Sequence, residues 1–151
     1  MAGRAYVTYD QQAVTTPLDS VLNLTGSTTI VFDIFYCAFS CLTDELDDML
    51  QWTIARTTTV GTGDSLTPSP MIFDGTIASN TGVTGNLTAE PTYTANLTLL
   101  DIAVNTRSFQ QWYAQPGREL ASESAANAGI GIGALHGSST PTVLCTVHFL
   151  E

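Results

Sequence analysis

The sequence contains no lysine, and this absence limits the partners that the protein can have. Its only fixed cations are four arginines, which stand against fourteen Asp and Glu residues, so the formal net charge is −10 over 151 residues. Proteins bind nucleic acids largely by neutralising phosphates with basic side chains. We therefore expect no nucleic-acid partner.

Charged residues of either sign are scarce as well. They make up 12% of the chain, against about 25% in an ordinary globular protein. Hydrophobic residues make up 44%, and threonine alone occupies 24 positions. Because the apolar content suffices for a core, the shortage of charge does not indicate disorder. It indicates a surface built mainly from hydroxyl and backbone groups.

Cysteine and long apolar runs are also in short supply. The three cysteines, Cys37, Cys41 and Cys145, form an odd set without a CxxC pair, which favours a reduced, cytoplasmic origin over a disulfide framework. The longest apolar run, Ile30 to Leu42, is too short to span a bilayer, and the first residues lack the apolar core of a signal peptide. We therefore expect no membrane partner.

The length fits one domain, which we place at 1–151. Short β-branched and aromatic runs, bounded by turn-forming residues, predict an all-β fold. We expect an antiparallel β-sandwich, jelly-roll-like, of about eight strands, with residues 1–19 as an N-terminal arm or edge strand. The expected strands are Ala5–Tyr9, Ser20–Leu24, Thr29–Phe39, Gln51–Thr59, Thr92–Thr98, Asp101–Thr106, Ala128–Leu135 and Thr142–Leu150.

The last of these strands has the clearest pattern. Val143, Cys145, Val147 and Phe149 occupy alternate positions and form one apolar face, whereas the other face is mixed and includes His148. A mixed face of this kind can be covered by a partner.

One short helix is expected at Asp44–Leu50, with Thr43 as its N-cap. The segments Val60–Pro70 and Asp74–Glu90 are rich in Gly, Thr, Ser and Asn and are expected to be loops. Ordered loops of this length are unusual in a small domain and favour an assembly in which they lie against something else.

Residues with catalytic or metal-binding chemistry are present but poorly placed. The acidic cluster at 44–48 lacks the ligand spacing of an EF-hand and is interpreted as a solvated helix face, with ion binding as the less favoured alternative. His136 and His148 have no partner at zinc-ligand spacing, and Cys37 and Cys41 lie in an apolar strand where a thiol is inert. We expect no catalytic residue, metal or cofactor.

The run Gly129–Ala134 has the spacing of a phosphate-binding loop, but no helical sequence follows it. We therefore expect its glycines to let a backbone or a bulky ring approach closely.

An aromatic segment runs from Phe109 to Arg118 and contains Trp112 and Tyr113. Three interpretations are open. The two rings can close the core, form the hot spot of a protein interface, or stack on sugar rings.

Four segments together resemble a family of small virion proteins, the capsid cement (head decoration) proteins of tailed bacteriophages. They are an Arg-x-Tyr start, an acidic stretch before a strand that ends in Arg, an aromatic Trp-containing stretch before Pro-Gly-Arg, and a final strand that ends in Glu. In this sequence they correspond to 4–15, 44–56, 105–120 and 145–151.

The resemblance implies a non-enzymatic β-sandwich that is made in the host cytoplasm. It implies a homo-oligomer, a trimer, on the outer surface of the head, which ties neighbouring major capsid protein subunits together. An acidic, lysine-free chain would be repelled by packaged DNA, which agrees with an outside location. The candidate interface residues are Arg4, Tyr6, Tyr9, Arg107, Trp112, Tyr113 and Arg118.

The alternative function is a carbohydrate- or receptor-binding module of a phage tail or fibre, with Trp112 and Tyr113 as the stacking platform. An enzyme would need an oligomer that brings His136 or His148 to acidic groups of another chain.

Overall fold

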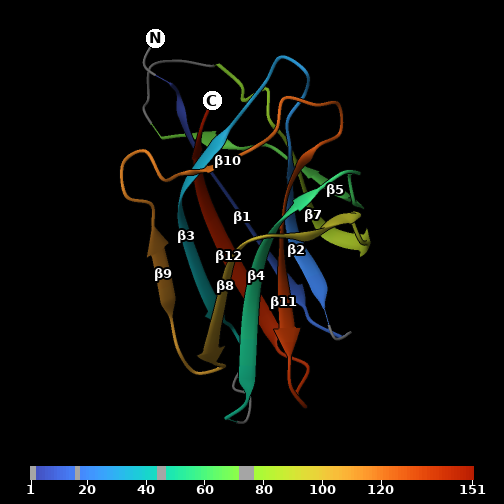
Figure 1. Ribbon diagram of the computed structural model, residues 1–151. Coiled ribbons are helices and arrows are strands. Elements are labelled where there is room, and N and C mark those ends of the chain that lie inside the picture. The colour runs from blue at the N-terminus through green and yellow to red at the C-terminus, as the bar shows by residue number, and fades with distance from the viewer. Residues whose placement is uncertain (1–2, 16–17, 44–46, 72–76) are drawn as a thin grey trace.

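The computed structural model describes residues 3–15, 18–43, 47–71 and 77–151 (Figure 1). It contains twelve strands, and the described residues contain no helix. The strands are β1 (Ala5–Ala13), β2 (Asp19–Thr25), β3 (Asp33–Cys41), β4 (Met49–Thr57), β5 (Thr62–Leu66), β6 (Ser69–Pro70), β7 (Gly82–Ala89), β8 (Tyr93–Asn105), β9 (Gln110–Tyr113), β10 (Leu120–Ala121), β11 (Gly129–His136) and β12 (Thr142–Leu150).

The strands form two antiparallel sheets, which we call sheet A and sheet B. In sheet A, β9 and β10 both pair with β3, and the order continues through β12 and β1 to β6; in sheet B the order is β5-β7-β2-β11-β4-β8. Consecutive strands change sheet at eight connections: β1–β2, β2–β3, β3–β4, β5–β6, β6–β7, β8–β9, β10–β11 and β11–β12. This alternation is the jelly-roll arrangement. The expected β-sandwich is therefore confirmed.

The core lies between the two sheets. Along β12, Val143, Cys145, Val147 and Phe149 are fully buried, as their alternation predicts. Across the sandwich the Trp52 ring of β4 packs against β3 by stacking on Phe39, with ring centroids 4.7 Å apart. Each such side chain contributes about 1.5–3 kcal/mol when it leaves water.

The long connection between β4 and β8 extends both sheets, which corrects the expectation of loops there. Within Val60–Pro70 the chain forms β5, which pairs with β7, and β6, which pairs with β1; within Asp74–Glu90 it forms β7, which pairs with β2. Residues 74–76 lie outside the described residues. β5 and β7 contain glycine and few large apolar residues, and β6 has only two residues, so their structure depends on the strands with which they pair.

The same connection is fastened to β1 by side chains. The Gln12 amide donates to the Leu87 carbonyl at 3.2 Å and accepts from the Leu87 N–H at 3.1 Å. The Asp10 carboxylate accepts from the Asn86 N–H. These bonds join the two sheets on the side of the sandwich where β1 and β7 lie.

Within the expected arm or edge strand at 1–19, residues 5–13 form β1. This strand pairs with β12 along its full length and has only β6, two residues long, on its other side. Residues 1–2 and 16–17 lie outside the described residues.

The expected helix at Asp44–Leu50 is wrong where it can be compared. Residues 44–46 lie outside the described residues, Asp47 and Asp48 are not helical, and Met49 and Leu50 begin β4. Leu50 continues the inward alternation of this strand and pairs with β8 and β11, so sheet pairing overrides the local helical pattern.

The structure also differs from the predicted strands at β8 and at β9 and β10. The expected strands Thr92–Thr98 and Asp101–Thr106 are one strand, β8, whose register against β4 shifts between Thr98 and Leu100. The short strands β9 and β10, in the region that the sequence leaves without strands, complete the edge of sheet A next to β3.

Candidate functional site

The outer face of sheet B is covered by the chain itself over β2 and part of β11. Tyr93 lies over β11 at Gly131, where an added Cβ would come within 2.7 Å of the Tyr93 ring. The Tyr93 hydroxyl bonds to the hydroxyl of Ser20, and the Glu90 carboxylate accepts from the Ser20 N–H at 3.1 Å. Burial raises the pKa of Tyr93 to about 12. The expectation that the glycines of this run admit a bulky ring is therefore confirmed.

The outer face of sheet A is different, because it carries one charged residue, Asp33, which lies at the start of β3 opposite Leu150 of β12. The two most exposed tyrosines of the described chain, Tyr9 at 68% and Tyr113 at 65%, lie on this face. We call the rest of this face, without Asp33, the uncharged face. Its residues, from the outward positions of β1, β3, β9 and β12, are Ala5, Val7, Tyr9, Gln11, Phe35, Tyr36, Ala38, Ser40, Gln111, Tyr113, Leu144, Thr146, His148 and Leu150.

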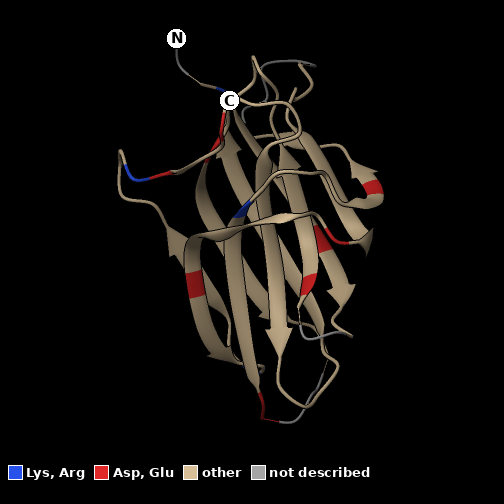
Figure 2. Cartoon of the chain, turned by 45° about the vertical axis from the view of Figure 1, so that its right-hand side comes forward, with Lys and Arg blue, Asp and Glu red and all other residues tan. Residues whose placement is uncertain are grey.

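Charge is sparse over the rest of the molecule as well. Figure 2 shows Asp, Glu and Arg as isolated bands, several of them in connections rather than in strands. Two ion pairs join described residues: Arg56 with Glu123 at 3.6 Å, and Arg107 with Asp47 at 3.3 Å. Neither pair includes a residue of the uncharged face.

A row of aromatic rings crosses the uncharged face at one level. Tyr36 of β3 lies between Tyr113 of β9 and His148 of β12, with ring centroids 4.6 and 4.4 Å away. Gln111 donates to the Tyr36 hydroxyl at 3.0 Å, and Phe35 packs edge-on against His148. Cross-strand pairs of this kind hold large side chains in fixed positions before any partner arrives.

The two ionisable groups in the centre of this row are held in their neutral forms. Burial lowers the pKa of His148 and raises the pKa of Tyr36. At neutral pH the row therefore adds no charge to the face.

Of the seven candidate interface residues, Tyr9 and Tyr113 lie on the uncharged face, on β1 and β9, with β12 and β3 between these two strands. Tyr6 does not belong to an interface, because it is 1% exposed and stacks on Phe149 in the core, with its hydroxyl bonded to the Ile77 carbonyl. Trp112 points inward and packs, partly buried, against the core. Within the aromatic segment, Trp112 therefore packs against the core, whereas the next residue, Tyr113, is exposed.

The three candidate arginines lie outside the strands of the uncharged face. Arg4 precedes β1, Arg107 follows β8 and is paired with Asp47, and Arg118 is exposed in the turn between β9 and β10. The structure does not bring them together with Tyr9 and Tyr113 into one site. Their role as anchors stays a prediction.

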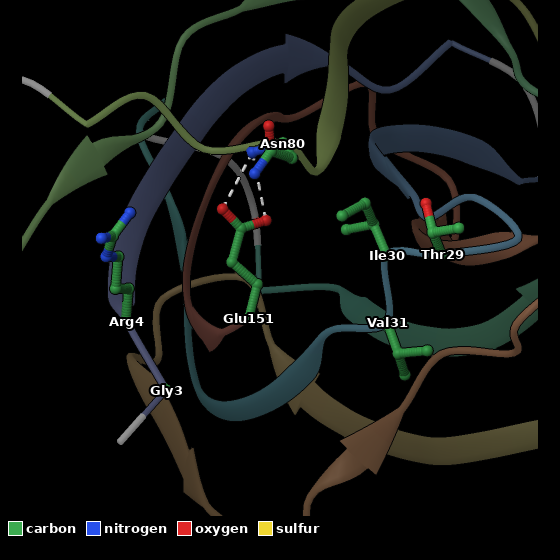
Figure 3. Close-up of a pocket in the computed structure, with 7 residues that line it drawn as sticks. All are labelled: Gly3, Arg4, Thr29, Ile30, Val31, Asn80 and Glu151. Atoms are coloured by element: carbon green, nitrogen blue, oxygen red, sulfur yellow. Dashed lines mark hydrogen bonds between the residues drawn. The ribbon is translucent and has the colours of Figure 1, made fainter. Parts of the chain in front are cut away.

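Arg4 lines a pocket of about 610 Å³ at the end of the sandwich where β1 begins and β12 ends (Figure 3). The Glu151 carboxylate points into this region and accepts from the backbone N–H groups of Asn80, at 2.8 Å, and Thr81, at 2.9 Å, and from the Thr81 hydroxyl. The acidic group is thus occupied in fastening the segment before β7 to the end of β12.

The acidic cluster at 44–48 is only partly described, but its last member has a structural role. The Asp48 carboxylate accepts from the N–H groups of Ser138 and Ser139, at 2.6 and 2.9 Å, and fixes the turn between β11 and β12. These bonds hold the pKa of Asp48 well below its usual range. Asp47, in contrast, is exposed and paired with Arg107.

The remaining reactive groups are dispersed. Cys37 and Cys145 are buried, and burial raises the pKa of both thiols; Cys41 is partly exposed beside Thr43. Among the described residues, no three His, Cys, Asp or Glu side chains gather as a metal site would require.

Comparison with family models, with curated proteins and with solved structures finds no match for this chain. A search of the described residues for a helix long and apolar enough to cross a membrane finds none.

Sequence reasoning missed part of the uncharged face. It singled out Tyr9 and Tyr113 and recognised the mixed face of β12, but not Phe35 and Tyr36, which lie within the apolar run at 30–42. The available signal was the two adjacent aromatic residues, which cannot both point into a core from a regular strand.

Proposed function

We propose that this chain is a non-enzymatic structural protein of a virus particle. It is a cement or decoration protein that forms a homo-oligomer, a trimer, on the outer surface of an icosahedral tailed-phage head, and it stabilises contacts between major capsid protein subunits. The observation that carries this proposal is the uncharged face of sheet A, with its fixed row of aromatic rings and its two exposed tyrosines.

The chemistry of the uncharged face suits a protein contact. Tyrosine contributes a large contact area with little loss of side-chain entropy and is enriched at interfaces. Because the face has no formal charge at neutral pH, a partner that covers it does not have to strip water from a carboxylate or a guanidinium, which is costly. For a chain with a net charge of −10, it is also a face where copies can approach with little repulsion.

The sugar-binding alternative is less well supported. It uses Trp112 and Tyr113 as one stacking platform, but neighbouring residues of a strand point to opposite faces, and Trp112 packs against the core. Only Tyr113 remains for a sugar ring.

The first test is the copy number of this protein, relative to the major capsid protein, in purified particles, measured by quantitative mass spectrometry. Near-stoichiometric copies are expected for a cement protein. A few copies per particle would favour a receptor-binding role in the tail, and absence from particles would remove the virion assignment.

The second test addresses the surface. Tyr113→Glu and Tyr9→Glu each place a carboxylate on the uncharged face, and we expect both to lower the oligomeric state measured by analytical ultracentrifugation. Val60→Glu is the matched control, because Val60 is 40% exposed in the connection between β4 and β5, away from this face. If the control weakens the oligomer as much as the tyrosine variants do, another surface holds the copies together.

A further inference from the structure

The two sheets end in strands of very different length. In sheet A, β6 has two residues and ends in Pro70, and β9 and β10 have four and two. In sheet B, β5 has five residues and includes Gly63, whereas β8 has thirteen. Short strands, prolines and irregular pairing are the means by which proteins blunt exposed sheet edges. Of the strands that end the two sheets, β8 is the longest.

The regular part of β8 runs from Leu100 to Asn105. Leu100, Ile102 and Val104 pair with β4 and pack partly buried against the core. Towards its start the register shift near Leu99 interrupts the ladder, and at its end the chain turns, with the Asn105 carbonyl accepting from the Ser108 N–H at 2.9 Å. The open edge therefore consists of the six residues from Leu100 to Asn105.

The direction of the backbone groups on this edge follows from one hydrogen bond. The Thr106 N–H donates to the Asp48 carbonyl at 3.0 Å, and in an antiparallel ladder every second residue pair is bonded in this way. Val104, Ile102 and Leu100 therefore direct their backbone groups towards β4. Asp101 and Ala103 direct theirs away from the sheet.

Nothing among the described residues pairs with this outer edge, since β8 is the last strand of sheet B. The edge contains neither lysine nor proline, the residues that most often protect exposed strands. Its one charge is Asp101, whose carboxylate lies on the outer face of the sheet and accepts from the Thr53 hydroxyl at 2.7 Å.

We propose that the Leu100–Asn105 edge of β8 receives an extended segment of a different protein, which adds to sheet B as a further strand and carries Lys or Arg opposite Asp101. Main-chain bonds to Asp101 and Ala103 supply the attachment, as in other cases of strand addition. Opposite charges on facing positions stabilise neighbouring strands. This inference goes beyond the proposed function and does not depend on it, because the edge can accept a strand in any assembly.

Charge is the reason for choosing a different protein over a second copy of β8. Two copies paired about a two-fold axis would bring two Asp101 carboxylates to facing or neighbouring positions on one side of the sheet, which is unfavourable. A second copy of β8 also has no Lys or Arg to place opposite Asp101.

The test uses two synthetic peptides on the full chain: acetyl-Thr-Val-Lys-Val-Thr-Val-amide and the same peptide with Glu in place of Lys. We expect the Lys peptide to bind at least tenfold more tightly, in a fluorescence titration with labelled peptide, and to slow hydrogen exchange at the Asp101 and Ala103 amides. Equal binding of both peptides, or no protection at these two amides, would overturn the proposal.

The decisive variant is Ala103→Pro, which removes an N–H that points away from the sheet and leaves the ladder to β4 intact. It is expected to abolish binding of the Lys peptide, whereas the matched control Ala103→Ser retains it. Binding that survives in Ala103→Pro would contradict the proposed site.

Two further measurements complete the test. If Ala103→Pro does not fold, Asp101→Lys replaces it and should reverse the peptide preference; an unchanged preference would contradict the pairing. Sedimentation without peptide compares the unmodified chain with Asp101→Asn. We expect this substitution to strengthen no dimer. A dimer that it strengthens would show that a second copy occupies the edge.

Discussion

The two outer faces of this sandwich place the same residue type in opposite situations. On sheet B, Tyr93 is laid over a strand of alternating glycines and bonded to Ser20, so its ring belongs to the fold. On sheet A, Tyr113 stands beside Tyr36 and is 65% exposed. In this protein, glycines at alternate outward positions of a strand lie under a side chain of the same chain. Aromatic residues and threonine at outward positions lie on the face that is open to a partner.

The largest effect should come from removing the ring that covers sheet B. Tyr93→Ala leaves the groove over Gly131 empty, and we expect it to lower the free energy of unfolding by about 3 kcal/mol. Tyr93→Phe, which loses only the bond to Ser20, should cost about 1 kcal/mol. Urea denaturation measures both, and a loss below about 1 kcal/mol for the alanine variant would show that the ring is not part of the fold.

Filling the groove should have a somewhat smaller effect. Gly131→Val places a side chain where the Tyr93 ring lies, and such overpacking costs about 1–3 kcal/mol. Gly82→Val is the matched control, because an added Cβ there would meet only Thr25, at 3.7 Å. Thermal melts of the two variants should therefore differ, and equal melting temperatures would contradict the covering role of Tyr93.

The corresponding change on sheet A should cost the protomer little. Tyr113→Ala removes one ring pair with Tyr36, worth about 0.5–1.5 kcal/mol, and leaves the core unchanged. The comparison with Tyr93→Ala, made under the same denaturing conditions at concentrations where the chain is monomeric, tests whether the uncharged face is external. Equal losses for the two variants would place Tyr113 in the core of the fold.

The smallest effect concerns pH. Because burial lowers the pKa of His148, the unfolded chain takes up a proton at a higher pH than the folded chain does. Stability should be constant above the ordinary His pKa of about 6.5 and fall as the pH drops below it. His148→Gln should remove this slope in a series of denaturation curves between pH 7.5 and 5; an unchanged slope would assign it to another group.

A separate acid transition is expected from Asp48. Hydrogen bonds from the turn lower its pKa, so its contribution is present above the ordinary Asp pKa of about 4 and is lost only as the pH falls further. The two transitions can therefore be resolved in one titration, and Asp48→Asn should remove only the more acidic one. Loss of the transition near pH 6 in this variant would contradict the assignment.

The elements that the sequence predicted are those whose pattern is local. β12 alternates without exception, and the glycine run of β11 could be interpreted from the absence of a following helix. The strands β6 and β7 could not be predicted, because they pair with β1 and β2, which lie more than fifty residues away, and β5 depends in turn on its pairing with β7. The prediction of a helix at 44–50 was wrong for the same reason, because Met49 and Leu50 pair with strands more than fifty residues away.

The sequence predicted which aromatic residues are candidates for the site, but not which of their side chains point away from the core. In β1, Tyr6 and Tyr9 stand three positions apart, so one of them must point into the core and the other away from it. The sequence has apolar or aromatic residues at both parities, and only the pairing with β12 determines that Tyr6 is the buried one. Trp112 and Tyr113 were ambiguous for the same reason.

The position of β12 also affects when the protein can fold during synthesis. This strand lies between β1 and β3, and Tyr6 pairs with Phe149. Sheet A therefore cannot assemble until β12 has left the ribosome, and at about 5–20 residues per second β1 waits roughly 10–30 s for this neighbour. During that time the aromatic strands β1 and β3 lack their neighbour in the sheet, which makes chaperone binding to them a factor in the yield of the protein.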